Sequence, residues 1–134
     1  MKFELKFFSF LLSIVFLAGC TKLVKESDLS NAHYPPEPKK ELVDSFIKDH
    51  LNSVLRDPKS LILKCSKTRK GWARQYRSSS PEFGWVTPCM VNAKNGLGGY
   101  TGSKLYVYLY STSGFKYLDG TLFRGFDEHV GYVK

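Results

Sequence analysis

The residues that could carry chemistry in this chain are three cysteines, three histidines and a few carboxylates. His33, His50 and His129 are far apart, and no second cysteine pair or histidine pair lies at a spacing that holds zinc. No Ser/His/Asp or Cys/His arrangement has the spacing of a nucleophilic site. Asp127-Glu128-His129 are neighbours in sequence, and we expect a solvated end of the domain there rather than a catalytic set. The sequence therefore predicts a protein that is not an enzyme and that holds no cofactor and no metal.

The first twenty residues have the three parts of an export signal. Met1–Lys6 is short and positively charged, Phe7–Leu17 is almost wholly apolar, and Leu17-Ala18-Gly19-Cys20 ends the segment with small residues before a cysteine. This order is typical of a signal peptide. The apolar run is shorter than the roughly 20 residues that a permanent membrane helix needs. We therefore interpret it as the core of a signal rather than as a membrane span.

The four residues Leu17-Ala18-Gly19-Cys20 resemble the lipobox of bacterial lipoproteins. The resemblance implies that residues 1–19 are a lipoprotein signal peptide and that Cys20 becomes the lipid-modified first residue, which anchors the protein to a membrane. The alternative is an ordinary secreted protein with an accidental cysteine. Thr21 stands where an aspartate is the usual signal for inner-membrane retention. The resemblance therefore favours a place in the cell envelope on the outer membrane, facing the periplasm.

Cleavage before Cys20 would leave 115 residues, which suit one small domain. Loss of the signal lowers the formal net charge from +8 to +7. Residues 20–40 lack periodicity and contain three prolines, so we expect a lipidated tether there, followed by a small periplasmic domain over residues 41–134. In an oxidising periplasm Cys65 and Cys89 most simply form one disulfide. Free buried thiols or a metal site are the alternatives.

The pattern changes at residue 42, where apolar or weakly polar pairs begin to recur every four positions. The pairs are Leu42-Val43, Phe46-Ile47, His50-Leu51 and Val54-Leu55. This period predicts an amphipathic helix of about four turns, which Asp57-Pro58 ends. Because His50 lies on the apolar stripe, we expect it to be packed rather than functional.

Four segments after the helix have the composition of strands: Ser60–Ser66, Gly84–Ala93, Lys104–Tyr110 and Phe115–Leu118. Pro88 predicts an edge position or a bulge in the second. In Lys104–Tyr110, aliphatic residues alternate with tyrosines. We expect the tyrosines to cover the wetter face of the sheet, or alternatively to bind sugar rings or peptide. The fold class is therefore α+β, with one N-terminal amphipathic helix packed on a small antiparallel sheet of three to four strands.

Residues 67–81 are polar, basic and rich in serine, and we expect a long excursion here, or a loose hairpin around Trp72. The stretch Lys64–Arg77 is too polar to form core, so we expect its side chains to face solvent or an acidic partner. No acidic residue occurs between Asp57 and Glu82. The candidate binding residues in this stretch are Lys67, Arg69, Lys70 and Arg74. Basic surfaces with aromatic residues can bind nucleic acid, but a lipoprotein rarely meets any. Lipid head groups, lipopolysaccharide or acidic proteins are therefore the better candidates.

The loop Asn92–Ser103 contains four glycines, which predict several backbone positions with positive φ. It has no match to Gly-x-x-x-x-Gly-Lys-Ser/Thr, so it is not a phosphate loop. Two interpretations stay open. The segment is either a rigid hairpin or a recognition loop built around Lys94, Asn95 and Tyr100.

Two motifs resemble a group of small uncharacterised bacterial lipoproteins and exported proteins. They are Asp57-Pro58-Lys59-Ser60, and Cys89-Met90-Val91-Asn92-Ala93-Lys94-Asn95 followed by Gly98-Gly99-Tyr100-Thr101-Gly102. The resemblance covers about residues 42–110, and the chain departs from the group at Leu97, where an aromatic residue is common. It implies a shared fold and no particular activity.

Two non-catalytic functions fit these observations. The first is a structural or adaptor component that docks on a protein partner in a larger envelope assembly. The second is a binding module for an anionic envelope component, namely a lipid, a glycolipid or an acidic protein. A lysozyme-inhibitor lipoprotein would share the size and the single disulfide, but a basic inhibitor repels a basic enzyme.

Overall fold

The computed structural model describes residues 23–134, so the expected signal peptide and Cys20 lie outside the described residues. The described part has the expected α+β class, but its antiparallel sheet has six strands rather than three to four. The helices are α1 (Glu26–Asn31) and α2 (Lys40–Val54). The strands are β1 (Ile62–Cys65), β2 (Arg69–Ala73), β3 (Glu82–Asn92), β4 (Lys104–Ser111), β5 (Gly114–Asp119) and β6 (Val130–Tyr132). No helix within residues 23–134 is long and apolar enough to cross a membrane.

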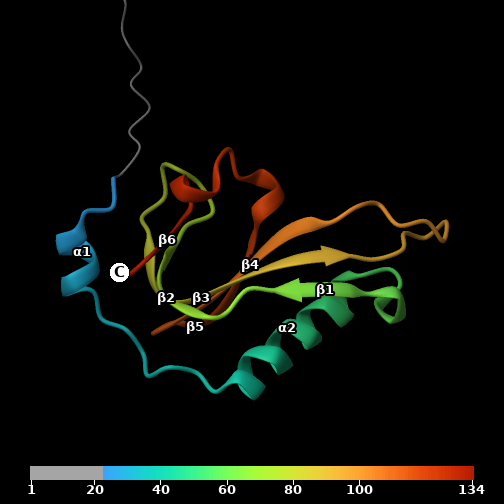
Figure 1. The fold of residues 1–134 in the computed structure, drawn as a ribbon, viewed down its shortest axis with the longest axis horizontal. Coiled ribbons are helices and arrows are strands. Elements are labelled where there is room, and N and C mark those ends of the chain that lie inside the picture. Colours follow the sequence, from blue (N-terminus) through green and yellow to red (C-terminus); the bar gives the residue numbers. More distant parts are fainter. Residues whose placement is uncertain (1–22) are drawn as a thin grey trace, which may run out of the picture.

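The predicted amphipathic helix is confirmed as α2. The sequence pattern suggested two buried residues per turn. In the structure one residue per turn is buried, namely Val43, Ile47 and Leu51, so the apolar stripe is narrower than expected. These residues recur at i, i+4 and i+8 and so lie on one face of the helix. α2 runs along one face of the sheet (Figure 1).

The strands follow the order β5-β4-β3-β2-β6, and β1 also pairs with β3. β3 is long enough to pair with two strands, β2 and β1, one after the other along the same side. β2 pairs with residues 82–86 of β3, and β1 pairs with residues 89–92. Two of the strands were not expected from the sequence. β2 lies in the stretch predicted as an excursion, and β6 comes from the tail without periodicity.

Pro88 lies in β3, which has neighbours on both sides, so the expected edge position is wrong. The Pro88 carbonyl accepts a hydrogen bond from the Ser66 N–H, at an N–O distance of 2.8 Å. In an antiparallel ladder both backbone polar groups of a residue point to the same side. The missing N–H of Pro88 therefore faces the break between β1 and β2, where it removes only one ladder hydrogen bond.

Both faces of the sheet are covered. On one face, Val43, Ile47 and Leu51 of α2 form a core with Cys89, Val91 and Tyr108 of the sheet. On the opposite face a second core contains Ala73, Val86, Val107, Leu109, Leu118 and Val130, with Phe123 and Phe126 against it from the C-terminal segment. Tyr108 is only 1 % exposed. The tyrosines of β4 therefore lie on the helix-covered face, and the expectation that they line the wetter face is wrong.

The segment expected as a tether begins with α1 and then contacts the domain. Trp85 donates a hydrogen bond from its indole Nε1 to the Pro35 carbonyl at 2.9 Å. Tyr34 lies edge-on to the Phe83 ring, with 6.3 Å between ring centroids. Residues 34–35 are thus fixed against β3, while both cores are built entirely from residues 43–132.

Candidate anion-binding groove

The two cysteines of the described residues lie where the predicted disulfide requires them. Cys65 of β1 and Cys89 of β3 are direct partners in the antiparallel register. They form a disulfide, which confirms the predicted pairing. Cys20, the expected lipidation site, lies outside the described residues.

The basic run divides between several environments. Lys70 extends over the Tyr34 ring, with its Nζ 4.4 Å from the ring centroid, and Arg69 stacks on Tyr132, with its Cζ 4.2 Å from the ring centroid. Arg74, in contrast, is only 4 % exposed, and its Nε donates a hydrogen bond to the Glu128 carbonyl at 2.8 Å. Burial and the neighbouring Arg77 lower the pKa of the Arg74 guanidinium, against the opposing effect of Glu128.

The expectation that all of these charges face solvent or a partner is therefore wrong for Arg74. Three residues of β2 in the same basic stretch, Gly71, Trp72 and Ala73, are also buried, so this stretch does contribute to the core. A related correction applies to the expected solvated end. His129 is buried, its ring stacks on Phe123 with 4.2 Å between centroids, and its Nδ1 lies 3.2 Å from the Arg74 carbonyl.

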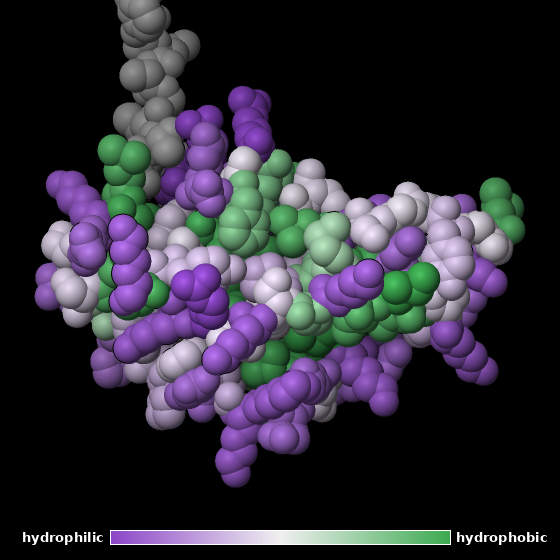
Figure 2. All heavy atoms as spheres, viewed as in Figure 1, coloured by the Kyte–Doolittle hydropathy of each residue, from purple (hydrophilic) through white to green (hydrophobic). Residues whose placement is uncertain are grey.

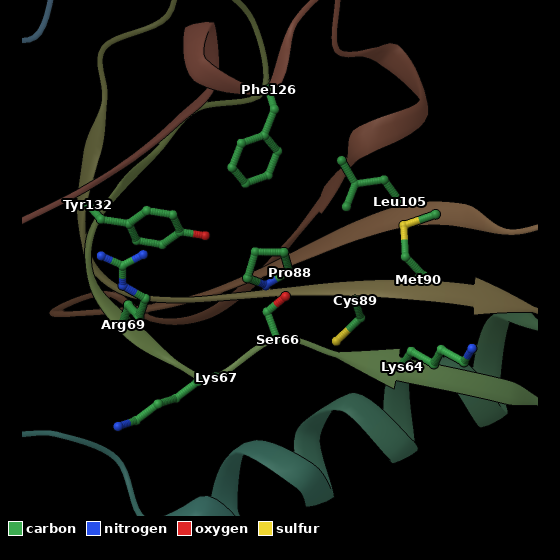
Figure 3. Close-up of a pocket in the computed structure, with 10 residues that line it drawn as sticks. All are labelled: Lys64, Ser66, Lys67, Arg69, Pro88, Cys89, Met90, Leu105, Phe126 and Tyr132. Atoms are coloured by element: carbon green, nitrogen blue, oxygen red, sulfur yellow. The ribbon is translucent and has the colours of Figure 1, made fainter.

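A groove of about 430 Å³ opens on the face of the sheet opposite α2, beside the junction of β1 and β2. Figure 3 shows the side chains that line it. The apolar ones come from the middle of the sheet and from the C-terminal segment: Pro88, Met90, Leu105 and Phe126. The polar ones come from the β1–β2 junction and from β6: Lys64, Ser66, Lys67, Arg69 and Tyr132. No carboxylate is among the residues of 23–134 that line the groove.

The polar edge has unused donors. The hydroxyls of Ser66 and Tyr132 both point toward the groove (Figure 3), and neither has a hydrogen-bond partner among residues 23–134. Lys64 and Arg69 flank these hydroxyls, whereas the Lys67 side chain points away from the groove. None of these three cations forms an ion pair within the described part of the chain. Burial raises the pKa of the Tyr132 hydroxyl, against the opposing charge of Arg69, so this hydroxyl keeps its proton and can donate.

The glycine-rich loop forms a hairpin that the Asp-Pro-Lys-Ser turn holds in place. Lys94 and Tyr100 face each other in a β-bridge. The Lys94 N–H donates to the Ser60 hydroxyl at 2.8 Å, and the Tyr100 hydroxyl donates to the Ser60 carbonyl at 3.0 Å. The Asn95 carboxamide oxygen accepts from the backbone N–H groups of Leu97 and Gly99, at 2.9 and 3.1 Å. Asn95 and Tyr100 therefore serve the hairpin's own structure, which favours the rigid-hairpin interpretation.

The hairpin also borders a second, smaller hollow of about 200 Å³ near the end of α2. Three of its lining residues are cations, namely Arg56, Lys94 and Lys104. Lys94 thus combines a structural backbone contact with an ammonium group that lies over the Tyr100 ring, 5.7 Å from the ring centroid. The residues that sequence reasoning missed are Lys64, Ser66 and Tyr132 of the groove. Lys64 and Ser66 are two positions apart in the segment predicted as a strand, Ser60–Ser66, and this spacing indicates that both side chains lie on the same face.

His50 illustrates a packed histidine, as expected from its place on the helix stripe. Its ring lies over Tyr117, with 4.3 Å between centroids, and its Nδ1 is 3.0 Å from the Tyr108 hydroxyl. Burial lowers the pKa of His50.

The groove, the hairpin and the disulfide are thus placed by contacts within this chain alone. Comparison with protein-family models, with curated proteins and with solved structures gave no match. What the molecule does is therefore inferred from the chemistry of the groove itself.

Proposed function

We propose that this chain is a membrane-anchored, non-catalytic lipoprotein whose exported domain binds an anionic component of the cell envelope. The observation that carries the proposal is the polar edge of the groove. The Ser66 and Tyr132 hydroxyls, which have no hydrogen-bond partner among residues 23–134, point into the groove there, Arg69 stacks on Tyr132, and no carboxylate is among the described lining residues. Hydrogen bonds from charged donors to an anion are about twice as strong as those between neutral groups.

The surroundings of the groove support the same function. Figure 2 shows hydrophilic side chains around an apolar area, and those along the lower part of the view lie over α2 and do not belong to the groove. Two further cations belong to the same stretch of chain as Arg69: Lys67 lies at the rim of the groove, and Lys70 points to the opposite face of the sheet and extends over Tyr34. Near an anionic surface each such cation is worth about 1 kcal/mol, within a Debye length of about 8 Å at physiological salt.

Binding to anionic vesicles tests the proposal. A chain of residues 23–134 keeps both cores, and it should bind vesicles that contain phosphatidylglycerol but not vesicles of phosphatidylcholine alone, with release as salt rises. Glutamine at four cations should abolish this binding: Lys64, Lys67, Arg69 and Lys70. Arg74 is left unchanged because it is buried. The matched control removes the same charge from four exposed lysines elsewhere, Lys25, Lys39, Lys48 and Lys59. Equal loss in both variants would mean that net charge, and not the groove, attracts the vesicles.

The lipid anchor needs its own test. Replacement of Cys20 by Ala should remove fatty-acid labelling and shift the protein out of the membrane fraction, since the thiol is the lipid acceptor in the lipobox resemblance. A wild-type chain that takes up no labelled fatty acid, and a variant that stays in the membrane, would contradict the anchor.

The adaptor function remains the second candidate because of the free edge of the sheet at β1. Within residues 23–134 β1 pairs with β3 alone, and Ile62 and Leu63 are 47 % and 39 % exposed. Such an edge can add a strand from another protein. A stoichiometric protein partner recovered from solubilised envelopes, and lost on Leu63→Glu, would favour the adaptor over the anion-binding module.

A further inference from the structure

We propose that the ligand of the groove is a single-chain anionic amphiphile, with its charged group at the polar edge and its apolar part against the opposite wall. This inference rests on the proposed function and makes its ligand specific. It follows from how the lining residues are divided. Figure 3 shows Arg69, Tyr132 and Ser66 along one side, with Phe126, Leu105 and Met90 on the other and Lys64 at the end nearest Met90.

The polar edge suits a carboxylate or a phosphate. Arg69 is held by its stacking on Tyr132, so its guanidinium loses little freedom when it binds. The Tyr132 and Ser66 hydroxyls point into the same space and lack partners in the described residues. An anion there would receive hydrogen bonds from both hydroxyls and would lie near the charge of Arg69, which stacks on Tyr132; a neutral head group would not exploit that charge equally.

The apolar wall suits a flexible hydrocarbon. Met90 is 40 % exposed although it lies beside Leu105 in a paired strand. Methionine adapts its shape to irregular ligands. Phe126 is half-buried and stands over the groove from the 3₁₀-helix Phe126–Glu128. A bare inorganic anion would leave this apolar surface in water, so an apolar group attached to the anion gains affinity from covering it.

The size of the groove limits the ligand to one chain or ring system. Pockets that enclose most of a drug-sized molecule span roughly 300–1,000 Å³, and this groove, at about 430 Å³, lies near the lower end. We therefore commit to a monomeric amphiphile, such as a fatty acid or a lysophospholipid, and not to the surface of a bilayer.

Calorimetric titration of residues 23–134 tests whether the polar edge and the apolar wall of the groove both contribute to the affinity for a ligand. The probes are decanoate and decyl glucoside, each below its critical micelle concentration, and acetate. Decanoate should bind one to one and at least about tenfold more tightly than either of the others, because each of those lacks one of the two interactions. Arg69→Gln with Ser66→Ala should weaken decanoate binding by about tenfold or more, and Met90→Gln should weaken it without changing the affinity for acetate. Lys48→Gln, on the exposed face of α2, is the matched control and should leave all three affinities unchanged.

Each result separates the inference from the proposed function. Equal affinity for decanoate and acetate would leave an anion site in place and overturn the amphiphile. Equal affinity for decanoate and decyl glucoside would overturn both, because the charged edge would then contribute nothing. Binding to phosphatidylglycerol vesicles without binding to monomeric decanoate would overturn the inference in favour of a membrane surface, and no binding to any probe or vesicle would overturn both.

Discussion

The Ser60 hydroxyl should stabilise the hairpin, although Ser60 lies more than thirty residues earlier in the chain. It accepts a hydrogen bond from the Lys94 N–H and donates one to the Asp57 carbonyl, both at 2.8 Å. Ser60→Ala removes the acceptor and leaves the half-buried Lys94 N–H without its partner. An unsatisfied donor costs about 1–3 kcal/mol, and since water reaches part of this site we expect a loss of about 1–2 kcal/mol.

Urea unfolding at constant pH measures this loss as a lower midpoint with an unchanged slope. The melting temperature should fall by about 4–8 °C. Ser53→Ala is the matched control, because the Ser53 hydroxyl donates only to the His50 carbonyl on the exposed side of α2. Tyr100→Phe, which removes the hydroxyl bound to the Ser60 carbonyl, should cost about 0.5–1.5 kcal/mol.

The double variant should lose less than the two single losses combined, because both groups hold the same hairpin. If Ser60→Ala unfolds at the same urea concentration as Ser53→Ala, the turn does not hold the hairpin and the reasoning fails. If Tyr100→Phe is neutral in stability and yet alters ligand binding, the recognition-loop interpretation returns.

Three further predictions concern other parts of the molecule. Reduction of the Cys65–Cys89 disulfide, which spans a sequence separation of 24, should lower the free energy of unfolding by about 3–4 kcal/mol; identical urea curves with and without reductant would contradict this. Gly98 has φ of +82° and Gly99 is not among the positive-φ glycines, so Gly98→Ala should cost about 1–2 kcal/mol and Gly99→Ala much less, which thermal melts would rank. Because burial lowers the pKa of His50 below its ordinary value of 6.5, its neutral form favours folding above pH 6.5, and this stability is lost as the pH falls through the lowered pKa. His50→Gln should flatten that part of the pH profile of urea midpoints, and an unchanged profile would assign the pH dependence to other groups.

The features that the sequence predicted well depend on local patterns. Residues 40–54 form a helix because their apolar period is that of a helix, and Cys65 and Cys89 were the only two cysteines left to pair. The strand β2 was missed because Arg69 and Lys70 hide its alternation and because its partners are distant. Gly71 packs so closely on β6 that a Cβ there would lie 2.0 Å from the Gly131 carbonyl oxygen. Such close approach is visible only when both strands are in place.

The two faces of β4 were also assigned wrongly, for a different reason. An alternation of aliphatic residues with tyrosines shows that a strand has two distinct faces, but it does not show what covers each one. In the fold Tyr108 packs beneath α2 and contacts Phe46, with 6.0 Å between ring centroids. The aromatic residues of the helix stripe were the only signal for this pairing. The groove could not be predicted at all, since its lining comes from four separate segments of the chain.

The position of the disulfide within β1 has a consequence for when the groove can exist. All four residues of β1 are exposed, so burial of apolar side chains does little to fix its alignment with β3. A shift by one residue would turn Lys64 and Ser66 away from the groove, because neighbouring side chains point to opposite faces. The covalent link at Cys65 forbids that shift. A chain with its thiols still reduced would therefore hold the polar edge only loosely. If the protein is exported as we propose, oxidation after export would set the geometry of the groove.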